Sequence, residues 1–169
     1  AMWLSDLADV LGAEAGVDEP ALVAAGRRAE LAAECALTSP RPAALLLLAA
    51  ARQAGKRVIA LSDTTLDDEL LGELLRFHGV VVDQAFSSGT LGASKRRGTV
   101  FSHLATQLGC AADGWVHVGD NLKVDVLRPA QHGLRPVWLP RTSPTTEVAQ
   151  VVEAALRPAG PVPRDAVGA

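Results

Sequence analysis

Short apolar segments alternate with longer amphipathic segments from residue 42 onward, and this order constrains the fold more than any other feature. Three apolar segments, at 57–61, 115–118 and 136–139, have the length and composition of buried strands. Helical spacing predicts helices between and around them, at 43–53, 66–77, 99–108 and 122–131. Such alternation predicts an α/β fold, with a parallel sheet and helices on both of its faces.

The remaining segments are less regular. Residues 80–82 and 85–86 predict short extended segments, and the Gly- and Ser-rich stretch 87–94 predicts a loop. Residues 3–36 carry apolar side chains at helical spacing, with Asp18 as an expected N-cap. We therefore predict three parts: a helical segment over 1–39, an α/β core over 40–142, and a C-terminal helix with a loose tail over 143–169.

Composition excludes several classes of protein. The 169 residues are 49% apolar with a net charge of -3 and no run of five like charges, which argues against nucleic-acid binding. Cys35 and Cys110 form no disulfide framework, which favours a reducing cytoplasm. The apolar run 43–51 is too short to cross a membrane. We expect a cytoplasmic protein that binds neither nucleic acid nor membrane.

Polar residues that could bind a ligand occur at three places, called stations here, after predicted strands or in their exit loops. The first is Ser62 with Asp63, and the second is Lys95. Ser62 and Asp63 follow the 57–61 strand, where a hydroxyl and backbone amides at a helix N-terminus can hold a phosphate. Helix capping is the alternative role for these two residues. Lys95 can neutralise a phosphate and a carboxylate together as a compact charge. A solvated basic loop is the alternative there.

The third station is Gly119-Asp120-Asn121 with Asp125, directly after the 115–118 strand. Carboxylates at the carboxyl end of such a strand lie where open α/β sheets bind ligands. Mg²⁺ usually binds through one or two carboxylates plus waters and phosphate, so Asp120 and Asp125 are candidate metal ligands. The alternative is that Asp120 and Asn121 only cap the next helix. His117, within the strand, is interpreted as a core or interface residue.

These three stations, in this order, resemble the haloacid dehalogenase superfamily of phosphohydrolases. Val58–Asp63 looks like its second motif, Lys95 like the third, and Val116–Asn121 with Asp125 like the fourth. The resemblance is closest to the branch found beside glycosyltransferases of polysaccharide biosynthesis, in which the helical unit containing Arg27–Glu30 resembles a cap. It implies a small phosphorylated metabolite or sugar as substrate, Mg²⁺ as cofactor, phosphate binding by Ser62, Asp63 and Lys95, and a catalytic role for Lys95.

One family element is not found. The first motif of the family is Asp-x-Asp on the central strand, where the first Asp is the nucleophile and the second the general acid/base, and no Asp-x-Asp occurs in this sequence. That strand would lie between the 57–61 and 115–118 strands. Orphaned buried backbone groups cost about 1–3 kcal/mol each. We therefore expect a fragment, direct pairing of the two flanking strands, or another segment in the slot.

Three hypotheses follow. In the first, the natural gene encodes a Mg²⁺-dependent phosphohydrolase and this chain is that protein without its first strand. In the second, the chain is a catalytically inactive binding or scaffolding domain of the same fold. In the third, it is an unrelated doubly wound binding module, for example receiver-like, which leaves the order of Ser62, Lys95 and Asp120 to chance.

Overall fold

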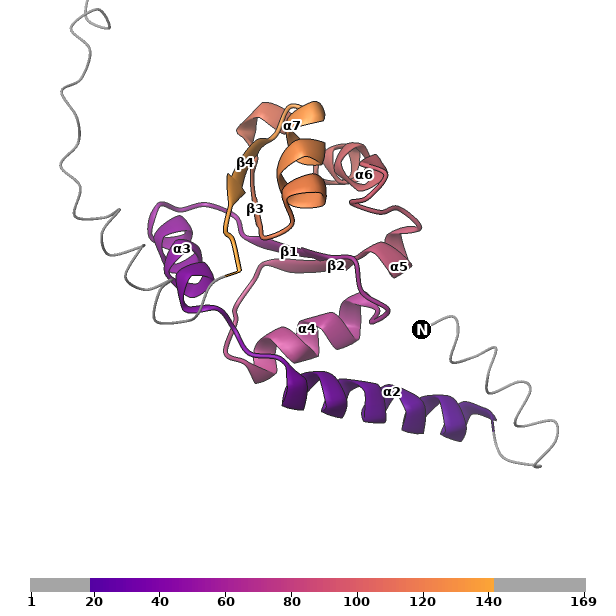
Figure 1. Ribbon diagram of the computed structural model, residues 1–169. Coiled ribbons are helices and arrows are strands. Elements are labelled where there is room, and N and C mark those ends of the chain that lie inside the picture. The colour runs from indigo at the N-terminus through magenta and orange to yellow at the C-terminus, as the bar shows by residue number, and fades with distance from the viewer. Residues whose placement is uncertain (1–18, 142–169) are drawn as a thin grey trace, which may run out of the picture.

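The computed structural model describes residues 19–141 as a mixed α/β structure (Figure 1). The predicted N-cap at Asp18 and the predicted helix after Ser143 lie outside the described residues. The helices are α2 (Glu19–Leu37), α3 (Pro42–Gln53), α4 (Asp68–Phe77), α5 (Ser88–Leu91), α6 (Thr99–Leu108), and α7 (Arg128–Gln131). A short 3-10 turn, η1 (Ala112–Gly114), precedes the third strand, and a turn of π-helix, η2 (Leu122–Leu127), follows it.

Four short strands form two parallel pairs. Strands β1 (Ile59–Ser62) and β2 (Gln84–Ser87) pair with Leu61 opposite Phe86. Strands β3 (Val116–Gly119) and β4 (Arg135–Trp138) pair with Val118 opposite Val137. The predicted α/β class with parallel strands is confirmed. In each pair a helical crossover joins the two strands, as parallel strands require.

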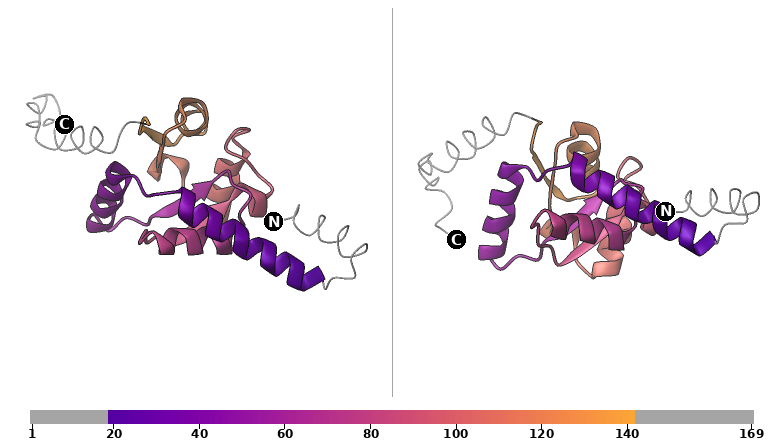
Figure 2. Two further views of the ribbon diagram at one scale, coloured as in Figure 1. Left: turned by 60° about the horizontal axis from the view of Figure 1, so that its bottom comes forward. Right: turned by 90° about the horizontal axis from the view of Figure 1, so that it is seen from below.

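Helices cover both faces of the β1–β2 pair. Phe86 packs with Phe101 and Leu104 of α6 in the main core, and Leu61 packs against that cluster. Ala85, on the opposite face, packs against the α4 residues Leu70 and Leu71. Helix α2 lies on the outer side of α4 (Figure 2). The apolar spacing of α4 and α6 explains this placement, since each buries one side against the strands.

Several predicted boundaries are corrected. The predicted extended segment 85–86 lies within β2 (Gln84–Ser87), whereas residues 80–82 belong to no strand. The predicted loop 87–94 begins with the end of β2 and the short helix α5, because buried Ser87 accepts a hydrogen bond from the Thr90 amide as an N-cap.

The predicted regular helix over 122–131 is also corrected, since its first six residues are π-helical. Pro129 supplies a physical reason. A proline ring clashes with the carbonyl group four residues earlier, here that of Asp125, and a wider turn relieves that clash.

The two strand pairs are separate within residues 19–141. Strand β1 pairs only with β2, and β3 pairs only with β4 (Figure 1). Neither direct pairing of β1 with β3 nor another described strand between them is found, so two of the three expected outcomes do not occur in this part of the chain. One face of the β3–β4 pair carries three valines, Val116, Val118 and Val137, which are 54%, 40% and 39% exposed. The β3–β4 pair therefore has an open face as well as an open edge.

No single helix within 19–141 is long and apolar enough to span a membrane. Helices α2 and α3 pass that test only when taken together, and the chain bends by 101° between them.

Candidate active site at the strand ends

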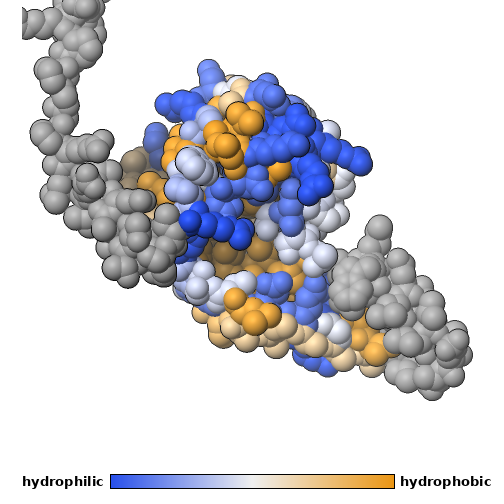
Figure 3. Space-filling model, viewed as in Figure 1, coloured by the Kyte–Doolittle hydropathy of each residue, from blue (hydrophilic) through white to orange (hydrophobic). Residues whose placement is uncertain are grey.

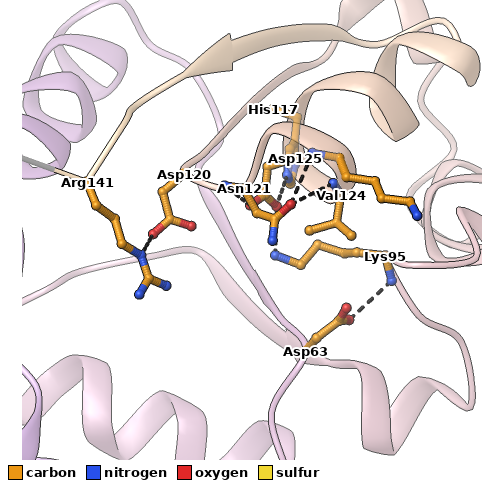
Figure 4. Close-up of polar contacts among 9 residues, drawn as sticks. Asp63, Lys95, His117, Asp120, Asn121, Val124, Asp125 and Arg141 are labelled. Atoms are coloured by element: carbon orange, nitrogen blue, oxygen red, sulfur yellow. Dashed lines mark hydrogen bonds and ion pairs between the residues drawn. The ribbon is translucent and has the colours of Figure 1, made fainter.

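Lys95 connects the ends of β1 and β3, although the three segments are far apart in the sequence (Figure 4). Its backbone amide donates to Asp63 Oδ1 at 3.1 Å, just after β1. Its side-chain Nζ donates to Asp125 Oδ1 at 2.9 Å, just after β3. The loop before α6 is thereby held against both strand ends, and the predicted meeting of these stations is found for Asp63, Lys95 and Asp125.

Asp125 is a buried carboxylate with a complete set of donors. It is 3% exposed. Oδ1 accepts from Lys95 and from His117 Nε2 at 3.0 Å, and Oδ2 accepts from the Asn121 amide at 3.0 Å. Burial alone would raise the pKa of Asp125, but the hydrogen bonds from His117 and Lys95, the Lys95 charge and the Asn121 amide together hold that pKa far below its ordinary value. Asp125 is therefore ionised throughout the neutral range.

His117 is a residue of this site that the sequence interpretation missed. The strand alternation correctly placed its side chain inward, but it lies between Asp125 and the Phe101 ring, with a ring-centroid distance of 5.3 Å to Phe101. An ionised carboxylate can only accept hydrogen bonds, so the Nε2 of His117 carries the hydrogen. The sequence did hold one sign of this contact. His117 and Gly119 are two residues apart, which puts them on the same face of β3.

Gly119 gives Asp125 the space that it occupies. A Cβ atom on Gly119 would lie 2.4 Å from Asp125 Cγ and 2.5 Å from Asp125 Cβ. The backbone of β3 therefore approaches the carboxylate more closely than any residue with a side chain would allow. This close approach, rather than an unusual backbone conformation, is the reason for glycine here.

We expect Gly119→Ala to lower the free energy of unfolding by about 1–3 kcal/mol, because the added methyl group displaces the buried carboxylate. Urea denaturation followed by circular dichroism measures the change. Gly114→Ala is a suitable control, since nothing lies within 4 Å of a Cβ atom at that position. Equal stability of the Gly119 and Gly114 variants would contradict the close packing described here.

Asp120 and Asn121 have different roles. Asn121 caps η2, since its Oδ1 accepts from the Lys123 and Val124 amides at 3.0 and 3.2 Å. Asp120 does not cap the helix; its carboxylate pairs with Arg141, whose side chain is 86% exposed (Figure 4). Capping, the alternative reading of both residues, therefore holds for Asn121 alone.

The two predicted metal ligands face different partners. Asp125 has both oxygens occupied by donors, whereas Asp120 has one exposed ion pair, a kind that contributes little stability and exchanges readily. Among residues 19–141 no group of three His, Cys, Asp or Glu side chains is arranged to hold a metal ion. One carboxylate with waters and a phosphate suffices for Mg²⁺, so the donor set fits this ion through Asp120 and not through Asp125.

The predicted phosphate station after β1 is only partly available. Ser62 ends β1 and is half-buried, and its hydroxyl has no hydrogen-bond partner within 19–141. The prediction that backbone amides at the N-terminus of α4 bind this phosphate is wrong. Asp67 caps that helix by accepting from the Leu70 amide at 2.9 Å. Two further carboxylates, Asp68 and Glu69, occupy its first turn and would repel an anion.

Helix α2 is attached to the loop after β1 by polar contacts. Arg27 pairs with Asp67 and Glu69, and Thr65 donates to Glu30 Oε1 at 2.8 Å. The ion pair with Asp67 raises the pKa of Arg27 through its hydrogen bond. Helix α2 is thereby tied to the first turn of α4 and to the loop that precedes it.

Compared with known protein families and with curated proteins, the chain matches no family model and no curated sequence. The chemical character of the site therefore rests on its own residues. They comprise one buried ion pair, one displaceable carboxylate and one unoccupied hydroxyl at the carboxyl ends of parallel strands.

Proposed function

We propose that this chain is the core of a Mg²⁺-dependent phosphohydrolase similar to the haloacid dehalogenase superfamily, acting on a small phosphorylated metabolite or sugar. The observation that carries the proposal is the double attachment of Lys95, through its amide to Asp63 and through Nζ to Asp125. These bonds bring the Lys95 loop to the carboxyl ends of β1 and β3, where open α/β sheets bind ligands, and this supports the proposal.

The residues of the chain have separate roles in this proposal. Ser62 donates its hydroxyl to a phosphate oxygen, and Lys95 supplies positive charge beside the phosphate as negative charge develops there. Asp125 orients the Lys95 ammonium group and is itself held by His117 and Asn121. Asp120 would hold Mg²⁺, which when bound neutralises charge on the phosphate.

The edges of β1 and β3 support the same proposal, since among the strands of residues 19–141 each pairs on one side only. A further parallel strand could pair at these edges, with its carboxyl end on the side where β1 ends at Ser62 and β3 ends before Asp120. The nucleophilic carboxylate of an Asp-x-Asp motif would be needed at that point, since covalent phosphoryl transfer requires an activated nucleophile. We propose that the active protein contains such a strand outside the 169 residues.

The test is to express the longest open reading frame that contains this sequence and to assay p-nitrophenyl phosphate hydrolysis with and without Mg²⁺. We expect Mg²⁺-dependent activity in the longer protein and none in the 169-residue chain. Asp120→Asn should lower kcat/KM by at least about a hundredfold, as loss of transition-state charge stabilisation does. Asp113→Asn, at an exposed position in η1, is the matched control.

Two results would contradict the proposal. One is an upstream stop codon with no segment carrying Asp-x-Asp, and the other is a longer protein without Mg²⁺-dependent hydrolysis. Either would favour the second candidate, a catalytically inactive binding domain. The complete pairing of Asp125 with Lys95 and His117 is the observation in favour of that candidate, because a fully paired carboxylate stabilises the fold without any ligand.

A further inference from the structure

The loop 92–98 is held in place by contacts from several elements. Its Lys95 is attached at both its amide and its Nζ, as described above. The Arg96 carbonyl accepts from Arg128 Nε at 3.1 Å, and the Arg97 amide donates to Ser94 Oγ at 3.3 Å. A Cβ atom on Gly98 would lie 2.4 Å from His132 Nε2, so the end of the loop packs tightly beside α7.

This fixed loop carries positive charges without carboxylate partners. Arg96 and Arg97 are exposed, and within 19–141 neither guanidinium group forms an ion pair or a hydrogen bond. Among the same described residues, the acceptors for Arg128 are both neutral oxygens, those of the Arg96 carbonyl and of Gln131, each at 3.1 Å. By contrast, the charge of Lys95 is balanced by Asp125. The surface over η2 and α7 is mixed, since hydrophilic and hydrophobic areas lie side by side there (Figure 3) and η2 exposes Leu122 and Leu127 at 52% and 54%.

The local charge balance differs from that of the whole chain. Lys95, Arg96, Arg97 and Arg128 meet at one loop, where the adjacent carboxylates are Asp63 and Asp125. The chain as a whole has a net charge of -3. Unscreened like charges repel one another, and a guanidinium group presents paired donors that match phosphate oxygens. A loop that is held by several hydrogen bonds and presents such groups, with no carboxylate partner for them among residues 19–141, is suited to bind an anion.

We propose that Arg96, Arg97 and Arg128 bind a second anionic group of the substrate, a phosphoryl group separate from the one held by Ser62 and Lys95. The substrate class is then a diphosphate or bisphosphate rather than a simple monoester. This inference rests on the proposed function for the position of the first phosphate. Arg96 and Arg97 follow Lys95 directly in the chain, and Arg128 donates to the Arg96 carbonyl, so all three arginines lie on or against the loop that carries Lys95.

The experiment measures binding of inorganic pyrophosphate and of orthophosphate to the 169-residue chain by isothermal titration calorimetry. Pyrophosphate is expected to bind at least about tenfold more tightly than orthophosphate, since it gains charge-assisted hydrogen bonds from the arginines. Arg96→Ala/Arg97→Ala should abolish this difference and leave orthophosphate binding nearly unchanged. Raising the salt concentration should weaken the pyrophosphate complex more than the orthophosphate complex.

The matched control is Arg57→Ala/Arg76→Ala, which removes the same charge away from the site. Both control arginines donate to neutral acceptors, Arg57 to Gln84 at the amino end of the β1–β2 pair and Arg76 to the Gly72 carbonyl in α4. Unchanged pyrophosphate affinity in this control supports a local site, whereas an equal loss in both double variants overturns it. All four arginines are exposed, so we expect the variants to fold. Circular dichroism melting curves of each variant test this and exclude unfolding as the cause of a lost affinity.

The outcomes separate this inference from the proposed function. Orthophosphate binding that is lost in Ser62→Ala, together with equal affinity for pyrophosphate, overturns the second anion site and leaves the proposed function standing. Arginine-dependent pyrophosphate binding that is insensitive to Ser62→Ala supports the anion site and contradicts the placement of the first phosphate. Tighter binding of a short single-stranded RNA than of pyrophosphate, lost in Arg96→Ala/Arg97→Ala, overturns the small-molecule inference.

Discussion

Asp125→Ala should lower the free energy of unfolding by about 3–5 kcal/mol, as the loss of one partner from a buried ion pair typically does. The substitution leaves the Lys95 ammonium group, 13% exposed at its side chain, without a counter-charge and removes the acceptor for His117 and for the Asn121 amide. Urea denaturation at neutral pH measures the change. Lys95→Met combined with Asp125→Ala should recover part of the loss, because no unpaired charge remains.

The control for this prediction is Asp113→Ala, an exposed carboxylate whose loss should change stability by no more than about 0.5 kcal/mol. A loss below about 1 kcal/mol in Asp125→Ala would mean that the pair contributes no more than a surface ion pair does.

Stability should also depend on pH through Asp125. Its pKa in the folded protein is lowered, so its contribution is fully present above the unfolded value of about 3.9 and is lost as the pH falls below that value toward the folded pKa. Asp125→Asn removes this acid-dependent contribution. The urea midpoint of the wild type should therefore fall more steeply below pH about 4 than that of Asp125→Asn, and parallel slopes would contradict the assignment.

Phe101→Ala should lower the free energy of unfolding by about 3–5 kcal/mol, the range for a fully buried aromatic residue. Phe101 is 1% exposed and packs within the main core, with its ring edge-on to His117 and 5.8 Å from His132 between centroids. The substitution leaves a cavity in the core. It also removes the ring that packs against His117, a partner of Asp125. Chemical denaturation gives the stability change, and histidine ring resonances in NMR spectra report the displaced His117.

Phe77→Ala is the matched control, because Phe77 is 67% exposed at the end of α4. Its loss should be within about 0.5 kcal/mol, as for most surface substitutions. Similar losses in the two variants would contradict the identification of the α6 face as the principal core.

Much of the fold was predictable because strong periodicity and Gly stops act locally. The 99–108 helix was predicted with the bounds that α6 has, since apolar spacing and the glycine at each end agree there. Segments without such agreement were predicted less well. The π-helical turn before Pro129 depends on a clash between residues four apart, and the short α5 depends on the buried Ser87 hydroxyl. Neither interaction produces a periodic pattern in the sequence.

The site was predictable in its stations and not in its pairings. The expected positions of Ser62, Lys95 and Asp120 at strand ends follow from the order of elements alone. The sequence does not indicate that Asp120 pairs with Arg141 whereas Asp125 pairs with Lys95, because these choices depend on the direction that each side chain takes, Asp120 before η2 and Asp125 within it. The role of His117 was also missed, because a histidine within a strand is usually a core residue.

The sequence by itself determined the α/β class, the parallel direction of the strands and the end of the sheet at which the polar residues gather. These properties follow from hydrophobic periodicity and from the connection of successive strands through helices, both of which are local in the chain. Only the tertiary structure decided that Lys95 neutralises Asp125, that Gly119 makes room for this carboxylate, and that β1 and β3 each pair on one side only among the described strands. Those properties depend on distances between segments that are remote in sequence, where packing and electrostatics select among partners that the sequence leaves equivalent.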